Sequence, residues 1–273
     1  SMRHSNSGSM AIPAVRPTGS SLLERCNIEY CDAMGLEVGA YATAVYCRIM
    51  HNGSLGAACS TKSTLSGCTI VSNNTRLCRP DVVAGGIKTY GTPEMDIHGT
   101  IESNEVAWNW GCGIWFDTCE GDGLKVVRNN YVHDNQPIST KYNFDGGMPG
   151  IHIELSRNAF VYNNLVVSNY SGITAVGSDN VAIFNNTIVG TRGYSAILVM
   201  SDTRRATCTN NVIMNNIIYN TLGNTYDLIM PLLTNEPFTS DIYCDYNCFQ
   251  RTGGIFRFAF RAGGIWTNVA GWT

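Results

Sequence analysis

Apolar and polar residues alternate along several short segments that begin with Gly-Ile, at 86–90, 113–117, 150–154 and 172–176. Successive side chains on a β-strand point to opposite faces, so this pattern predicts short strands with one buried and one outward face. We expect the buried set to comprise Ile87, Thr89, Ile114, Phe116, Ile151, Ile153, Ile173 and Ala175.

A repeat connects these strands to the rest of the chain. Cys26, Cys47 and Cys68 are spaced by 21 residues, and an isoleucine lies two positions after each of them. The same frame returns with asparagine at Asn130, Asn164, Asn186 and Asn211. The repeats lack the 3.6-residue periodicity of helices and the regular leucines of leucine-rich repeats. They therefore predict an all-β solenoid, a parallel β-helix of about nine coils with equivalent residues stacked in ladders.

The chain has eleven cysteines. An inward column of small, reduced cysteines explains the 21-residue spacing, which matches no zinc signature and has no histidine beside it. Two closer pairs, Cys112 with Cys119 and Cys244 with Cys248, leave open whether disulfides form.

The segments GIWFDTCEGDGLKVVRNNYVHDN and GIHIELSRNAFVYNNLVVSN resemble the bacterial right-handed β-helix repeat proteins, which are grouped with pectate lyases and other carbohydrate-active enzymes. The resemblance covers roughly residues 20–250 and implies a right-handed parallel β-helix that handles a polysaccharide. Residues 1–19 are expected to be a tail of the kind left by cloning. Residues 251–273 are similar to that family's closing segment but stop early, so we expect an open last coil through which copies self-associate.

Composition narrows the list of partners. Charged residues make up 14% of the chain, the net charge is −3 and no basic stripe is visible, so nucleic acid is not expected. No apolar run is long enough for a membrane helix, and the polar start lacks the apolar centre of a signal peptide. For a polysaccharide-handling protein we nevertheless expect an extracellular or periplasmic location.

The outward residues of the alternating strands carry the candidate chemistry. The predicted catalytic residues are Lys88, Asp117, His152 and Glu154. We expect Asp117 and Glu154 to lie in the same register one coil apart, with Lys88, Trp115 and His152 in the neighbouring column. Aromatic rings and polar side chains beside carboxylates suit sugars, so the predicted substrate-binding residues are Tyr90, Trp115, Lys141 and Tyr142. The last two lie in the insertion 136–149, which together with the insertion 75–83 is expected to flank a groove.

Three functions remain open. The lysine and histidine beside the acids favour β-elimination on a uronic-acid polymer, with Lys88 or His152 as the base and Ca²⁺ at Asp117 and Glu154, or a basic side chain, neutralising the uronate. A glycoside hydrolase would instead use Asp117 and Glu154 as its acid and base. A non-catalytic carbohydrate-binding or adhesive solenoid would use the same face without cleaving the glycan.

Overall fold

A computed structural model describes residues 12–92, 95–137, 148–202, 204, 208–219, 225–232, 242–252, 258–262 and 265–268. Every regular element in these ranges is a β-strand. The described part of the chain holds no helix long and apolar enough to cross a membrane.

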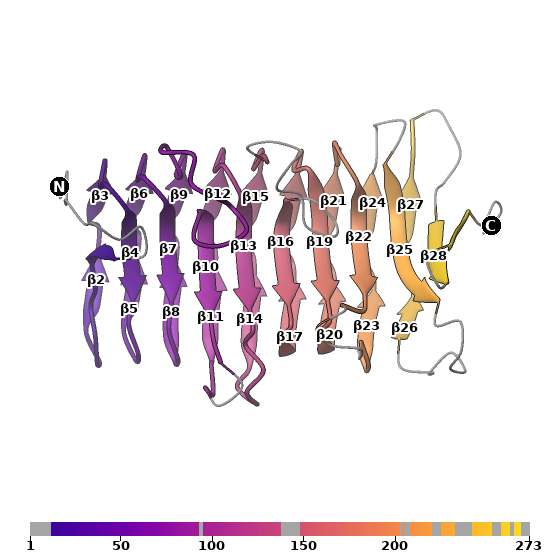
Figure 1. The fold of residues 1–273 in the computed structure, drawn as a ribbon, viewed down its shortest axis with the longest axis horizontal. Coiled ribbons are helices and arrows are strands. Elements are labelled where there is room, and N and C mark those ends of the chain that lie inside the picture. Colours follow the sequence, from indigo (N-terminus) through magenta and orange to yellow (C-terminus); the bar gives the residue numbers. More distant parts are fainter. Residues whose placement is uncertain are drawn as a thin grey trace.

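The strands form three sheets that run the length of the molecule (Figure 1). In the described residues the first sheet has eleven strands. They are β1 (Pro13–Val15), β4 (Met34–Val38), β7 (Leu55–Cys59), β10 (Gly85–Tyr90), β13 (Cys112–Asp117), β16 (Pro149–Glu154), β19 (Ser171–Val176), β22 (Ser195–Met200), β25 (Tyr226–Leu232), β28 (Phe258–Ala262) and β29 (Ile265–Asn268).

The second and third sheets have nine strands each within the same described ranges. The second comprises β2 (Leu22–Glu24), β5 (Thr43–Val45), β8 (Ser63–Ser66), β11 (Gly99–Glu102), β14 (Lys125–Arg128), β17 (Arg157–Tyr162), β20 (Asp179–Phe184), β23 (Asn211–Met214) and β26 (Ile242–Asp245). The third comprises β3 (Asn27–Glu29), β6 (Arg48–Met50), β9 (Thr69–Val71), β12 (Glu105–Ala107), β15 (Tyr131–His133), β18 (Leu165–Val167), β21 (Thr187–Val189), β24 (Ile217–Tyr219) and β27 (Cys248–Gln250).

Each coil contributes one strand to each sheet, and consecutive coils pair in parallel. This arrangement confirms the predicted parallel β-helix of about nine coils. The end of the first sheet differs, because β29 pairs with β28 in the antiparallel direction. Strands β2 and β28 lie at opposite ends of the long axis (Figure 1).

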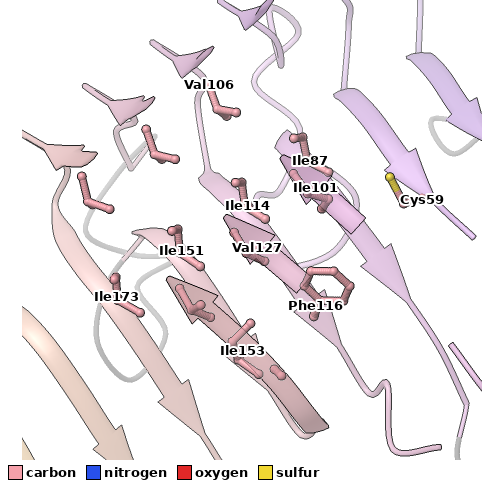
Figure 2. Close-up of a cluster of buried hydrophobic side chains, with 14 of the residues drawn as sticks. Cys59, Ile87, Ile101, Val106, Ile114, Phe116, Val127, Ile151, Ile153 and Ile173 are labelled. Carbon is pink, nitrogen blue, oxygen red and sulfur yellow. The ribbon is translucent and has the colours of Figure 1, made fainter. Parts of the chain in front are cut away.

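The core is the column of apolar side chains enclosed by the three sheets. Ile87, Ile114, Ile151 and Ile173 stack on successive strands of the first sheet, as Figure 2 shows. All eight residues predicted to face inward are buried. Burial of such β-branched side chains in repeated register holds each coil against the next, and it makes the opposite face of each strand point outward.

Ladders of polar side chains turn the chain at the corners between sheets. At the corner between the second and third sheets, the Asn130 amide donates to Asn164 Oδ1 at 3.0 Å, and its side chain donates to the Ile101 carbonyl at 2.9 Å. The ladder comprises Cys26, Cys47, Cys68, Asn104, Asn130, Asn164, Asn186, Asn216 and Asn247. Cys47 and Cys68 are buried as predicted.

One predicted member of this ladder is wrong. Asn211 begins β23 on the second sheet, and its side chain donates to the Ser178 carbonyl at 2.9 Å. Asn216 takes the ladder position instead. Both residues follow another asparagine, so the local sequence does not distinguish the start of a strand from the corner after it.

All eleven cysteines are free. Neither Cys112 with Cys119 nor Cys244 with Cys248 forms a disulfide. Cys112 and Cys119 are instead buried among apolar side chains, where burial raises the pKa of each thiol and keeps it protonated.

Candidate functional site

Two columns of outward side chains cross the middle of the first sheet. Strand pairing aligns Lys88 with Trp115 and Trp115 with His152, and it aligns Tyr90 with Asp117 and Asp117 with Glu154. The predicted registers of Asp117 with Glu154, and of Lys88, Trp115 and His152, are therefore confirmed. The columns arise because the isoleucines of β10, β13 and β16 are buried and their neighbours in the sequence must point outward.

Most of these outward residues are covered. Trp115 and His152 are 1% exposed and Lys88 is 6% exposed, whereas Tyr90 is 62% exposed at the end of β10. The connection between β9 and β10 reaches Lys88, whose ammonium donates to the Val82 carbonyl at 2.7 Å. Trp115 packs with the buried Met148 and Cys112. The site is thus a recess bordered by the connections between strands. The buried Trp115 lies at its base.

The Lys88 side chain is held by three partners. Its Nζ lies 2.8 Å from Asp117 Oδ2 and 3.4 Å from the centre of the Trp115 ring, in addition to its bond to the Val82 carbonyl. An ammonium on a ring face adds electrostatic attraction to the packing. The ammonium therefore occupies a face of Trp115, and the substrate-binding role predicted for that ring stays a prediction.

His152 is neutral in the folded protein. Burial lowers its pKa to about 3, although the Asp117 carboxylate acts in the opposite direction. Its Nδ1 shares a hydrogen bond of 2.6 Å with the Thr174 hydroxyl on β19, and its Nε2 lies 3.7 Å from Glu154 Oε2. The neutral imidazole thus lies beside the Glu154 carboxyl, beyond hydrogen-bond distance.

Arg204 and Asp202, in the connection after β22, complete the site. The Arg204 guanidinium donates to Glu154 Oε1 and bonds Asp202 through Nε at 2.8 Å. The hydrogen bond to Asp202 raises the pKa of Arg204, and the same bond lowers the pKa of Asp202. Both groups are therefore charged near neutral pH.

The sequence interpretation missed both residues. One signal was available: ten residues separate β22 from β23, whereas two separate β16 from β17 and two separate β19 from β20. A lengthened connection on one side of a solenoid usually builds its binding face.

These residues surround a pocket of about 270 Å³. Its lining residues are Asp81, Trp115, Asp117, His152, Glu154, Val176, Asp202 and Arg204. Asp81 lies in the connection between β9 and β10, within the predicted insertion 75–83. The lining contains four carboxyl groups and one guanidinium, so its wall is rich in hydrogen-bond acceptors.

Two predicted substrate residues, Lys141 and Tyr142, lie outside the described residues. The described ranges contain no cluster of three or more histidine, cysteine, aspartate or glutamate side chains placed to hold a metal ion. Asp117 and Glu154, the predicted calcium ligands, pair with Lys88 and Arg204 respectively. The calcium site stays a prediction.

A family model described as a right-handed β-helix region matches residues 65–188 and 94–228. The two matches together run from residue 65 to residue 228, which is more than half of the 273 residues. The chain belongs to the right-handed β-helix family. This assignment confirms the predicted handedness of the coil and the family resemblance seen in the sequence. No curated protein sequence matches the chain.

Several solved structures show distant similarity to the chain. The Dettilon tailspike protein is 13% identical with a TM-score of 0.37, over 84% of this chain and 61% of the tailspike chain. The mannuronan C-5 epimerase AlgE6 A-module of Azotobacter vinelandii is 15% identical with a TM-score of 0.39, over 91% and 75%. An exopolygalacturonase from Thermotoga maritima is 10% identical with a TM-score of 0.30, over 89% and 56%. The chain thus spans less than two thirds of the tailspike.

Proposed function

We propose that the β-helix binds a polysaccharide in the pocket over β13 and β16 and hydrolyses a glycosidic bond there. The observation that carries this proposal is the shared register of Asp117 and Glu154 on adjacent strands at the pocket wall. Neighbouring strands lie about 4.8 Å apart. Glycoside hydrolases place their two carboxyl groups about 5–9.5 Å apart, a range that side chains in this register reach.

In this mechanism one carboxyl group gives its proton to the glycosidic oxygen as the bond to the anomeric carbon breaks. The other carboxylate attacks that carbon directly or takes a proton from the attacking water. Lys88 and Arg204 act as positioning residues, because each holds one of the two carboxyl groups at the pocket wall. The remaining acceptors, Asp81 and Asp202, suit sugar hydroxyl groups.

Lys88 and His152 are the two candidate bases for β-elimination, the reaction that the sequence pattern alone favoured. Their contacts in the structure favour hydrolysis instead. The Lys88 side chain does not line the pocket, and its Nζ already contacts Asp117 Oδ2 and the Val82 carbonyl, so it is poorly placed to take a proton from a substrate. His152 is a weak base at a pKa of about 3. The surplus of carboxyl groups over guanidinium in the pocket wall also suits a neutral glycan better than a polyanion.

One observation favours elimination as the second candidate. Arg204 lines the pocket, and a guanidinium pairs well with a uronate carboxylate. A uronan would then have to displace Glu154 or Asp202 from Arg204.

The two reactions leave different products. The protein is incubated with neutral polymers (xylan, galactomannan) and with uronans (polygalacturonate, alginate), with and without EDTA. We expect new reducing ends from a neutral polymer and no rise in absorbance at the unsaturated-uronate band. A rise in that absorbance on a uronan would replace hydrolysis by elimination. The absence of any product from a panel that the protein still binds would leave the third function, glycan binding without cleavage.

A further inference from the structure

A second group of aromatic and acidic side chains lies away from the pocket. On the outer side of the third sheet β12 and β15 are neighbours, and strand pairing aligns Glu105 with Tyr131 and Ala107 with His133 (Figure 1). Trp108 and Asp134 follow directly, at the corner where the third sheet turns into the first. We call Glu105, Trp108, Tyr131, His133 and Asp134 the corner cluster.

The rings of the corner cluster are fixed in position. The His133 ring stacks on Tyr131, with centroids 4.0 Å apart and planes at 21°, and meets the edge of Trp108 at 4.9 Å and 81°. Its Nδ1 lies 3.0 Å from Asp134 Oδ2 and its Nε2 lies 3.4 Å from Glu105 Oε1. A buried histidine thus holds two aromatic rings and two carboxylates at one place.

These rings are open to solvent, unlike Trp115. Trp108 is 54% exposed and Tyr131 is 40% exposed. Arg192 adds a cation at the rim, with its guanidinium 2.5 Å from Asp134 Oδ1. An apolar protein partner would bury these charged groups at a cost. A sugar offers both an apolar ring face for the aromatic side chains and hydroxyl groups for the carboxylates.

We propose that the corner cluster is a second carbohydrate-binding site, where a sugar ring packs on Trp108 and Tyr131 and its hydroxyl groups donate to Glu105 and Asp134. The choice of a glycan as ligand rests on the proposed function of the pocket. The site holds a polymer chain outside the pocket and contributes affinity without contributing to bond cleavage.

The position of the cluster fits a continuous glycan. Trp108 precedes Trp115 by seven residues on the same coil, a stretch that spans at most about 25 Å. Between them, the carbonyl of the half-exposed Trp110 accepts a bond of 2.7 Å from Asn74, at the start of the connection that brings Asp81 to the pocket. The loop that follows Trp108 is therefore bonded to the connection that carries Asp81.

Native gels containing xylan, galactomannan or polygalacturonate test the second site. All variants carry Asp117→Asn so that the polymer is not consumed. Tyr46→Ala is the matched control, because Tyr46 is also an exposed aromatic residue with a positive φ (54°, against 51° for Trp108), but it lies at the corner between the second and third sheets. Thermal unfolding of each variant verifies that it is folded.

We expect at least one polymer to retard the protein, Trp108→Ala to weaken that retardation about tenfold, and Tyr46→Ala to leave it unchanged. Tyr131→Ala should act as Trp108→Ala does. Equal retardation of the Trp108→Ala and Tyr46→Ala variants, or no retardation by any polymer, overturns the second site. The result is independent of catalysis, since a protein that cleaves nothing still reports its binding in the gel.

Discussion

The ammonium of Lys88 and the carboxylate of Asp117 form a 2.8 Å ion pair whose side chains are only 7% and 13% exposed. Removing one partner of a largely buried pair leaves the other charge without compensation. We predict that Lys88→Met lowers the free energy of unfolding by about 3 kcal/mol. The double variant Lys88→Met/Asp117→Asn should lose less than the sum of the two single variants. Urea unfolding of the four proteins measures this coupling, and strictly additive losses would contradict it.

Acid should destabilise the protein through His152. Its pKa of about 3 in the folded state lies below the ordinary value near 6.5, so between these values the unfolded chain binds the proton more readily. The free energy of unfolding should therefore fall as the pH drops through this window. Between pH 7 and pH 4.5 wild type should lose about 2–3 kcal/mol more than His152→Gln. Identical pH profiles for the two proteins would refute this role.

The asparagine ladder should be sensitive to truncation. Asn130→Ala removes the acceptor of the Asn104 amide and the donor to the Ile101 carbonyl, and it leaves both groups buried and unbonded. We expect a loss of about 2–4 kcal/mol. Asn27→Ala, in the exposed part of β3, should change stability by less than about 0.5 kcal/mol. A similar midpoint of urea unfolding for both variants would contradict the ladder's importance.

Arg204 should matter for activity through its geometry. Lysine keeps the charge but does not bridge two carboxylates as a planar guanidinium does, so Arg204→Lys should lower kcat/KM on the cleaved polymer about tenfold. The matched control is Arg128→Lys, because Arg128 also joins two side chains, Glu102 and Tyr162, but on the second sheet. Equal activity of the two variants would remove Arg204 from the site.

The alternation of apolar and polar residues was sufficient to predict which side of β10, β13 and β16 faces the core. Because parallel coils stack in register, the same alternation also predicted that Asp117 lies beside Glu154. Which outward side chains of β10, β13 and β16 are buried depends on the connections between strands. The sequences of these connections have no periodicity. The strand pattern therefore could not predict that Trp115 is buried or that Arg204 contacts Glu154.

Local asparagine pairs were similarly ambiguous. Asn211 and Asn216 each follow another asparagine, yet one begins a strand and the other turns a corner. Only the hydrogen bonds to the preceding and following coils separate the two roles.

The proposed function depends on the carboxyl pair, so the most direct test replaces each member without changing its size. Asp117→Asn and Glu154→Gln are compared with Glu102→Gln, which also removes an ion-paired carboxylate but on the second sheet. Reducing ends released from the polymer that wild type cleaves are counted for each protein. We predict that the two pocket variants lose activity by at least about a hundredfold and that Glu102→Gln retains it. Full activity in both pocket variants would contradict the assignment of this site.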